Sequence, residues 1–245
     1  MPAQRTVEDF ILTSRFLKTE VKSIIYLPPN YSPLYTYPLV IAQDGRDYFN
    51  LGRIAGLTDS LIEKKAIVSP VICAIPYADV KQRWHRYHPD GDQHEAFIKY
   101  LVFELLPQLK AKYALDDLAS SRTLLGDSLG GTVSFITALR FPHTFGQVIM
   151  QSPYVNDKML HQVATYPEAE KLAIYHTIGL KEDEVKTTWG DLADFLTPNR
   201  ALHDALKQQG LASYEYKELE GNHTWKTWQA DLGNALMAML AREEA

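Results

Sequence analysis

The sequence predicts an α/β fold: one mostly parallel central sheet with an antiparallel N-terminal strand pair and helices on both faces. Short apolar runs alternate with longer segments of helical periodicity, and this alternation is typical of strands that helices connect across one sheet. Several of the short runs are almost continuously apolar, as central parallel strands are when both faces are covered. The length of 245 residues favours a single domain, 1–245, over two complete small ones.

The antiparallel pair is expected at the start of the chain. Val7 to Ser14 and Val21 to Leu27 carry β-branched and aromatic residues and are separated by a few polar ones, which favours two strands that pair directly. Pro28-Pro29-Asn30-Tyr31 then forces a loop. The remaining strands are predicted at Leu39–Ala42, Ile67–Ile75, Thr123–Leu125, Val148–Met150, Leu172–Ile178 and Tyr214–Leu219.

The clearest predicted helix covers Glu95 to Tyr113, where large apolar residues recur every four positions. Pro107 lies inside this segment and should kink it, because proline removes a backbone donor and collides with the preceding turn. The other helices are predicted at Leu129–Arg140, Arg200–Gln209 and Trp225–Arg242. The segment from His85 to His94 is expected to be a flexible polar loop.

Composition excludes several classes of protein. With 46% hydrophobic and 22% charged residues, the chain can bury a sizeable core and is neither disordered nor fibrous. Acidic residues outnumber basic ones by 30 to 25, for a net charge of -5, so no surplus of positive charge is available to bind nucleic acid. Prolines interrupt the most apolar stretch, Ala66 to Val80, and no membrane span is expected.

Two further features point to the cytoplasm. The first residues of the chain lack the pattern of a secretory signal. The single cysteine, Cys73, rules out an internal disulfide framework. It lies in the apolar run Val71-Ile72-Cys73-Ala74-Ile75, so we expect a buried and unreactive thiol.

The strongest chemical signal is Gly126-Asp127-Ser128-Leu129-Gly130-Gly131, a G-x-S-x-G match between a predicted strand and a predicted helix. A chance match would occur in roughly 0.03 of chains of this composition, and the plain alternative is a tight turn whose serine only caps the helix. The functional interpretation is a nucleophile elbow, in which a strained turn exposes the Ser128 hydroxyl. The N–H of Leu129 would then be one oxyanion donor.

A serine nucleophile needs a histidine base and an acid behind it, in the chain order serine, acid, histidine. His223 is the predicted base, because it lies in a glycine-containing loop between the last predicted strand and the last helix. His176 falls inside a predicted strand and is expected to be a core residue. The other histidines after Ser128 fall on predicted turns or helix faces, at His143, His161 and His203.

The acid is expected in the loop after the strand Leu172–Ile178, which reads Gly179-Leu180-Lys181-Glu182-Asp183-Glu184. Glu182 is the first choice and Asp183 the runner-up, while Glu184 and Asp194 stay open because such a charged run is by default a solvated turn. The second oxyanion donor is expected after the strand Leu39–Ala42, at the N–H of Arg46 with Gly45 as runner-up. An ordinary Asp-Gly turn without a role is the alternative.

Substrate contacts are expected from Arg83-Trp84-His85-Arg86-Tyr87, with Arg83, Trp84, Arg86 and Tyr87 as binding candidates, because this segment follows a strand at the edge where α/β sheets bind ligands. A surface loop is the equal alternative. Trp225 is a further candidate for substrate binding, and the alternative is that it only packs in the core. A metal cluster drawn from His85, His88, Asp90, Asp92 and His94 is disfavoured, because the spacing fits no standard zinc pattern.

Together these motifs resemble the esterase family of α/β-hydrolases that includes enterochelin-type siderophore esterases and esterase D, over almost the whole chain. The resemblance rests on Tyr26-Leu27-Pro28-Pro29-Asn30-Tyr31, Gln43-Asp44-Gly45, Phe97 with Glu104-Leu105-Leu106-Pro107, the Ser128 motif, and Gly221-Asn222-His223-Thr224-Trp225 with Trp228. It implies the α/β-hydrolase fold, a Ser-acid-His triad and no metal or organic cofactor. Gly221-Asn222-His223 departs from the Gly-Gly-His usual in relatives.

The expected function is therefore a serine carboxylesterase that acts on a small-molecule ester through an acyl-enzyme. A siderophore trilactone, a carbohydrate acyl ester and a thioester such as S-formylglutathione stay open as substrates. Acyl transfer to an alcohol is a variant of this function, and a homodimer is left open. From other classes, the alternatives are a non-catalytic binding protein on the same fold and a metal-dependent hydrolase.

Overall fold

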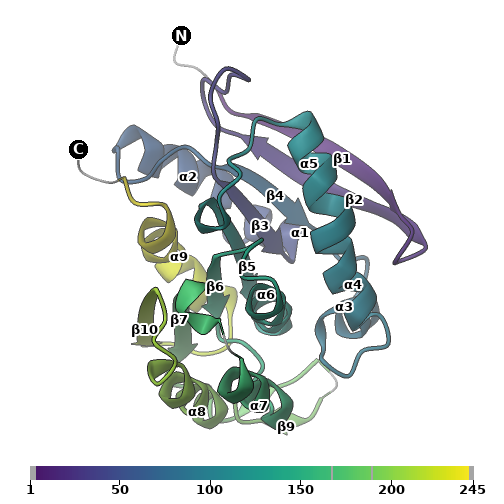
Figure 1. Ribbon diagram of the computed structural model, residues 1–245. Helices are drawn as coiled ribbons and strands as arrows, with labels where there is room; N and C mark the ends of the chain where they lie inside the picture. The colour runs from purple at the N-terminus through teal and green to yellow at the C-terminus, as the bar shows by residue number, and fades with distance from the viewer. Residues whose placement is uncertain (1–3, 167, 189, 243–245) are drawn as a thin grey trace.

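The computed structural model describes residues 4–166, 168–188 and 190–242, which form one eight-stranded sheet between two layers of helices (Figure 1). The strands of the sheet lie in the order β1-β2-β4-β3-β5-β6-β7-β10. Their bounds are β1 Thr6–Ser14, β2 Thr19–Leu27, β3 Leu39–Gln43, β4 Val71–Ile75, β5 Arg122–Asp127, β6 Gln147–Gln151, β7 Ala173–Gly179 and β10 Ser213–Leu219. A separate antiparallel pair consists of β8 Val185–Lys186 and β9 Leu192–Ala193.

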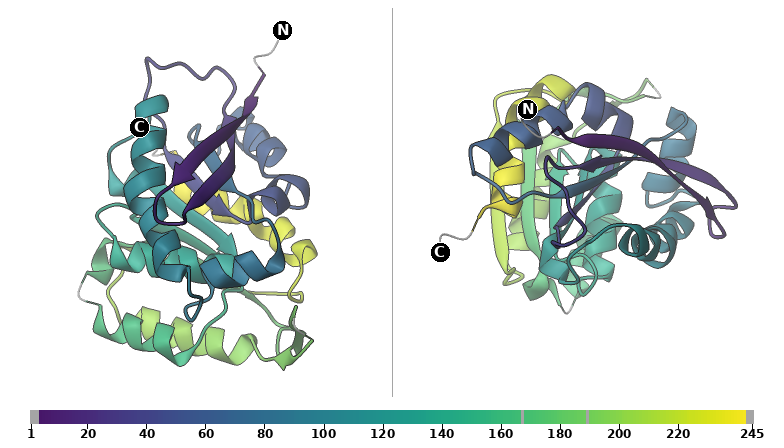
Figure 2. Two further views of the ribbon diagram at one scale, coloured as in Figure 1. Left: turned by 90° about the vertical axis from the view of Figure 1, so that its right-hand side faces the viewer. Right: turned by 90° about the horizontal axis from the view of Figure 1, so that it is seen from above.

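The N-terminal strands form the predicted antiparallel pair. Thr6 of β1 faces Leu27 of β2 and Ser14 faces Thr19, and β2 continues antiparallel onto β4. From β4 to β10 all pairings are parallel. Figure 2 shows the purple β1–β2 pair at one edge of the sheet, with β10 at the other. The carboxyl ends of the parallel strands therefore meet along one edge.

Helices cover both faces of the sheet. Their bounds are α1 Gly45–Asn50, α2 Ile54–Glu63, α3 Val80–Tyr87, α4 His94–Tyr100, α5 Leu106–Lys112, α6 Leu129–Arg140, α7 Asp157–Thr165, α8 Leu196–Lys207 and α9 Trp225–Leu240. The buried residues of α4, α5 and α6 pack on one face, and those of α1, α2 and α9 pack on the other. The α7 and α8 helices lie side by side (Figure 1), and most of their buried apolar residues belong to the same core cluster as those of α6.

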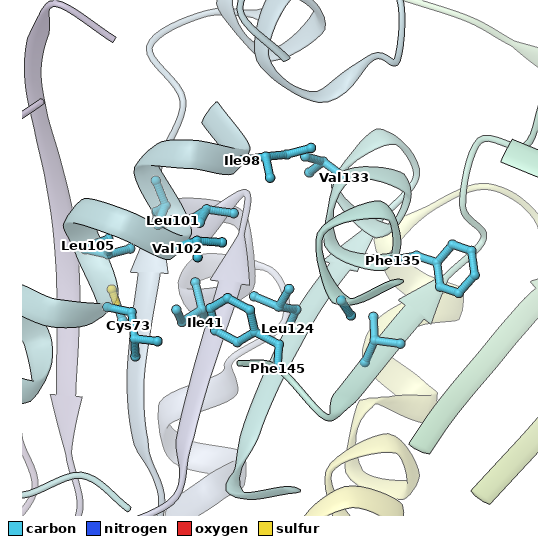
Figure 3. Packing of buried hydrophobic residues seen from close by; sticks show 14 of the residues in the cluster. Ile41, Cys73, Ile98, Leu101, Val102, Leu105, Leu124, Val133, Phe135 and Phe145 are labelled. Carbon is cyan, nitrogen blue, oxygen red and sulfur yellow. The ribbon is translucent and has the colours of Figure 1, made fainter. Parts of the chain in front are cut away.

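The continuous apolar runs are explained by this double cover. Along β3, Ile41 contributes to the core under α4 and α5, whereas its neighbours Val40 and Ala42 contribute to the core under α9, because successive strand residues point to opposite faces. Figure 3 shows Ile41 and Leu124 meeting helix residues on the first face. The prediction of an α/β sheet with buried central strands is confirmed.

Cys73 lies in this core, fully buried in β4 (Figure 3). Burial raises the pKa of its thiol to about 12, because a thiolate is poorly stabilised away from water. We expect a disulfide reagent at pH 8 to leave Cys73 unmodified in the folded protein and to titrate one thiol in denaturant. Rapid modification of the native protein would contradict this placement.

His176 is buried in β7, as the sequence predicts. Its Nε2 lies 2.7 Å from Asn199 Oδ1 and its Nδ1 lies 3.2 Å from the Tyr214 hydroxyl. Burial lowers the pKa of His176 to about 4, because the charged imidazolium would lose its hydration.

This burial makes stability depend on pH. The unfolded chain binds a proton at His176 below pH about 6.5, whereas the folded chain does not bind it until pH approaches 4. The contribution of His176 to the free energy of unfolding is therefore complete above pH 6.5 and decreases by up to about 1.4 kcal/mol per pH unit as the pH falls toward 4. Urea unfolding at several pH values should give a shallower dependence for His176→Gln. If the free energy of unfolding depended on pH equally in the wild type and in His176→Gln, the lowered pKa of His176 would be contradicted.

The predicted helix Glu95–Tyr113 is confirmed as one continuous helical stretch, which consists of α4, a π-helical segment η1 (Leu101–Leu105) and α5. Pro107 lies in the first turn of α5. In a regular helix the proline ring would collide with the carbonyl of Phe103, four residues earlier, and Phe103 lies in the π-helical segment η1. Other local predictions were wrong. The predicted strand Ile67–Ile75 begins only at Val71, after Ser69 and Pro70.

Helices were also missed or misplaced. The polar segment before Glu95 contains α3, whose N-terminus is capped by the Asp79 carboxylate, 2.8 Å from the Gln82 N–H. The α8 helix begins at Leu196 rather than at Arg200, and α1, α2 and α7 were not predicted. Among the described residues, none of the helices combines the length and the apolar character that a membrane crossing requires.

Candidate active site

The candidate residues come together at the carboxyl edge of the sheet. Each follows the end of a parallel strand, and the strands concerned are neighbours in the order β3-β5-β6-β7-β10. In that order the residues that follow the strands are Asp44, Ser128, Ser152, Glu182 and His223. Segments far apart in the sequence therefore supply one site, as expected at this edge of an α/β sheet.

Ser128 lies in a tight turn between β5 and α6. Its backbone has φ 50° and ψ -125°, which is a strained conformation for a residue with a side chain. The turn is so tight that a Cβ on Gly126 would lie 2.2 Å from the backbone of Gly130, and only glycine avoids this collision. The Ser128 N–H donates to the Gln151 carbonyl at 2.9 Å, which ties the turn to the neighbouring strand.

Glu182 is the acid that meets His223. Its Oε2 lies 2.6 Å from His223 Nδ1, and the carboxylate is completely buried while the imidazole is 14% exposed. The other oxygen, Oε1, accepts hydrogen bonds from the Ser152 hydroxyl at 2.7 Å and from the Gly179 N–H at 2.9 Å. Three donors thus surround the buried carboxylate and hold it in one orientation toward His223.

The competing carboxylates point elsewhere. Asp183 and Glu184 are exposed on the same loop. Asp194 is exposed as well, and its side chain accepts a hydrogen bond from the Thr197 N–H at 3.0 Å at the start of α8. In the described structure, Glu182 is the carboxylate at His223.

Ser152 was not anticipated from the sequence. Its backbone is in the left-handed region, with φ 47°, and its hydroxyl accepts a hydrogen bond from the Trp228 indole N–H at 2.9 Å while it donates to Glu182. A chain of hydrogen bonds therefore runs from Trp228 through Ser152 and Glu182 to His223. The position of Ser152, two residues after the predicted strand Val148–Met150, was the signal that could have revealed it.

The predicted oxyanion donors lie in the first turns of two helices. Leu129 is the first residue of α6 and Arg46 the second of α1, and N–H groups at these positions have no carbonyl partner within their own helix. The left-handed residue of the β3–α1 turn is Asp44, with φ 54°, rather than Gly45. Gly45 is needed for a close approach instead, because a Cβ there would lie 2.4 Å from the Ala74 carbonyl carbon.

Two of the predicted substrate-binding residues, Arg86 and Tyr87, are buried, which corrects part of the expectation. Tyr87 is 1% exposed and packs against Phe97, with ring centroids 5.1 Å apart. Arg86 is buried and donates to Gln93 at 3.3 Å. Arg83 is paired with Asp44. Both Arg86 and Tyr87 are therefore packing residues, since α3 turns them away from solvent.

Aromatic side chains form a continuous belt past the site, and we call these residues the aromatic belt. Neighbouring ring centroids along it are 4.8, 4.9, 6.1 and 4.3 Å apart. In order, its members are Trp84, His88, Tyr154, Phe195 and His223. The Tyr154 N–H is 3.3 Å from the Ser128 carbonyl, which places the belt next to the elbow. Tyr154 and Phe195 were missed because they lie in irregular loops.

Trp225 is connected to His223 through Trp228, whose ring centroid is 4.9 Å from that of His223. Its ring lies 5.6 Å from that of Trp228 and 4.8 Å from that of Tyr48, edge to face in both cases. Trp225 is half-buried, so it combines a packing role with an accessible edge.

The histidine-rich segment is divided into separate contacts. His85 Nδ1 lies 2.6 Å from Asp92 Oδ1, Asp90 pairs with Lys158, and His94 is buried at the start of α4. Within residues 4–166, 168–188 and 190–242, no three His, Cys, Asp or Glu side chains gather in a way that could hold a metal ion.

Comparison with known proteins places the chain among esterases. A family model described as "Putative esterase" matches residues 14–239. The uncharacterized protein YjcH of Bacillus subtilis (strain 168) is 43% identical over 239 residues, which cover 98% of this chain and 99% of that protein. The iron(III) enterobactin esterase of Escherichia coli O6:H1 is 24% identical over 210 residues, covering 82% of this chain and 49% of the relative, so the chain spans about half the length of that protein.

Solved structures share the fold. The enterobactin esterase of Shigella flexneri superposes with a TM-score of 0.83 at 22% identity, covering 97% of this chain and 60% of that one. A ferulic acid esterase superposes with a TM-score of 0.80 at 16% identity, covering 96% of this chain and 98% of that one. These similarities and the sheet order show the α/β-hydrolase fold. Because the family match runs from residue 14 to residue 239, the chain belongs to the Putative esterase family and is an esterase, a hydrolase of carboxylic ester bonds.

Proposed function

We propose that the protein is a serine esterase whose triad is Ser128, His223 and Glu182. The observation that carries the proposal is the hydrogen bond from His223 Nδ1 to a fully buried Glu182 beside a strained serine turn. This bond fixes the imidazole with its proton on Nδ1, which leaves Nε2 free to accept the proton of the serine hydroxyl.

The reaction then proceeds in two half-reactions. Ser128 Oγ attacks the ester carbonyl carbon, and His223 Nε2 takes the hydroxyl proton. The tetrahedral intermediate places its negative oxygen near the N–H groups of Leu129 and Arg46. Its collapse breaks the bond to the alcohol, which leaves with the proton from His223. Water repeats the sequence on the acyl-enzyme and releases the acid.

We further propose that the preferred substrate carries a flat aromatic group. From His223 the aromatic belt runs through Phe195, whose ring centroid is 4.3 Å away, and on through Tyr154 and His88 to Trp84. Aromatic groups prefer to stack on such surfaces. The similar structures are named for enterobactin and for ferulic acid. Two further structures of the Shigella flexneri esterase were determined in the presence of 2,3-dihydroxy-N-benzoyl-glycine and 2,3-dihydroxy-N-benzoyl-serine, which are aromatic as well.

The covalent step is tested first with a chromogenic acetate ester. We expect a burst of released alcohol equal to the enzyme concentration and an acetylated protein by intact mass, because acyl-enzyme formation precedes its hydrolysis. A peptide map should place the adduct on Ser128. Absence of a burst, of an adduct and of labelling by a fluorophosphonate would instead support a non-catalytic binding protein.

The substrate class is tested with a panel. Enterobactin, methyl ferulate, an acetylated sugar and S-formylglutathione are compared by kcat/KM. We expect the two aromatic substrates to exceed the acetylated sugar and the thioester by at least about tenfold, and Trp84→Ala to reduce that preference, since one lost aromatic contact is worth about 1 kcal/mol. A higher kcat/KM for the sugar ester or thioester would reject this substrate class.

A further inference from the structure

A buried ion pair lies directly behind the elbow. The Arg83 guanidinium reaches from α3 to Asp44, with Nε at 2.9 and 3.0 Å from the two carboxylate oxygens and Nη2 at 2.5 Å from Oδ2. The Asp44 side chain is 2% exposed and that of Arg83 is 15% exposed. Burial disfavours the charge on Arg83, but the Asp44 carboxylate outweighs this effect and raises the pKa of Arg83.

The same guanidinium also holds the elbow. Arg83 Nη2 donates to the backbone carbonyl of Asp127 at 3.2 Å, and Asp127 is the residue immediately before Ser128. The rings of Tyr77 and Tyr87 flank the guanidinium, with its carbon 5.8 and 5.7 Å from their centroids. These contacts leave the arginine little freedom to move.

Asp44 is packed between the two helix starts that carry the proposed oxyanion donors. Its carbonyl accepts from the Asp47 N–H at 2.8 Å, which closes the first turn of α1 around Arg46. On the other side, a Cβ at Gly130 would lie 3.0 Å from Asp44 Oδ2, so the carboxylate touches the first turn of α6 beside Leu129. A displacement of Asp44 would therefore move one donor relative to the other.

The charges in the cluster are compatible with one tight pair. Burial, followed by the nearby Asp44 charge, raises the pKa of Asp127 well above its usual range, because one guanidinium cannot neutralise two buried carboxylates. The Arg83 side chain thus binds the Asp44 carboxylate and the Asp127 backbone carbonyl, and its Nη2 lies 3.7 Å from Asp127 Oδ2, a longer contact than those to Asp44. In this way Arg83 links β3–α1 to β5–α6.

We propose that Arg83 is a positioning residue that sets the separation of the Arg46 and Leu129 N–H groups and so shapes the oxyanion hole. This inference rests on the proposed serine mechanism. Because the arginine acts on donors that bind the developing oxyanion more strongly than the ground-state ester, its loss should reduce kcat with little change in KM.

The test uses Arg83→Lys with Arg122→Lys as a matched control. An ammonium group can contact Asp44 but cannot reproduce the fork that also reaches the Asp127 carbonyl. Arg122 is likewise buried and likewise donates to backbone carbonyls, those of Asp116 and Thr144, but it begins β5 at the opposite end from Asp127. Both variants therefore lose guanidinium hydrogen bonds to backbone carbonyls, and only Arg83→Lys disturbs the elbow.

We expect kcat of Arg83→Lys on the chromogenic acetate to fall about 10- to 100-fold, since a misplacement of about 1 Å costs this much, with KM within about threefold. A trifluoromethyl ketone that adds to Ser128 places its oxyanion in the same hole. Its inhibition constant should rise by the factor by which kcat/KM falls. Arg122→Lys should lower thermal stability to a similar extent and keep kcat and the inhibition constant within about twofold.

Other outcomes overturn the proposal. If Arg83→Lys keeps the wild-type kcat and inhibition constant, Arg83 has no positioning role. The same conclusion follows if kcat falls and the inhibition constant rises as much in Arg122→Lys as in Arg83→Lys. If Arg83→Lys fails to fold, Asp44→Asn removes the same ion pair from the other side and must show the same split between kcat and KM. Failure of the serine mechanism itself is recognised separately, because the ketone would then not inhibit the wild-type protein and Ser128→Ala would stay active.

Discussion

Replacement of Ser128 by alanine is expected to reduce kcat on a chromogenic ester by at least about 10⁴-fold and to abolish the acyl adduct. The variant loses the oxygen that forms the covalent bond, while the Glu182–His223 pair and the helix starts stay in place. Only binding and oxyanion stabilisation then remain, and these contribute a small part of the acceleration by a serine triad. Steady-state kinetics and intact mass measure the two effects.

A stability comparison tests whether the turn stores strain. Ser128 has φ 50° and ψ -125°, a backbone conformation whose free-energy cost is much lower for glycine than for a residue with a Cβ. Ser128→Gly should therefore be more stable to unfolding than Ser128→Ala by about 1 kcal/mol, although both are inactive. Wild-type activity in Ser128→Ala would reject the nucleophile, and a less stable glycine variant would reject the strained turn.

The sequence predicted the sheet well where burial alone determines the pattern. The strands β3, β4 and β5 are covered on both faces, so runs such as Val71–Ile75 must be apolar throughout. The N-terminal pair was also predictable, because two β-branched runs close in sequence favour a direct antiparallel pairing. Their register depends on contacts along the whole pair and was not predicted.

Short helices and irregular turns were harder to predict. The α1 helix has 6 residues, too few to establish a periodic pattern. The α3 helix was missed because its sequence is mostly polar, although its buried side carries Arg86 and Tyr87. A hydropathy pattern does not reveal an arginine that is buried against another side chain. The π-helical segment before Pro107 depends on how the chain accommodates the proline ring, which local propensity does not specify.

The candidate site was predictable to the extent that it depends on chain order. The elbow motif and the histidine loop each follow a strand, and neighbouring strand ends bring them together. The partner of Arg83 was not predictable, because Asp44 lies 39 positions earlier in the chain. The sequence favoured Glu182 over Asp183 without excluding the latter, since only tertiary contacts decide which of these neighbouring carboxylates is buried.

The choice between these carboxylates gives the second large expected effect. Glu182→Gln should reduce kcat by about 10⁴-fold with little loss of structure. The amide oxygen can still accept from the Ser152 hydroxyl and the Gly179 N–H, which contact Oε1. The amide NH₂ then faces His223 Nδ1 in place of Oε2. A donor at that point forces the imidazole proton onto Nε2, where it prevents uptake of the serine proton.

Asp183→Asn is the matched control, because it makes the same change of carboxylate to amide one residue further along, on an exposed side chain. It should keep kcat within about twofold and leave thermal stability within about 0.5 kcal/mol. Both variants are compared on the chromogenic ester, with circular dichroism to verify the fold. If Asp183→Asn abolished activity while Glu182→Gln preserved it, the acid would be Asp183, and the buried hydrogen bond to His223 would be structural. Loss of activity only in Glu182→Gln would instead link the buried carboxylate to the tautomer of His223 and hence to proton transfer from Ser128.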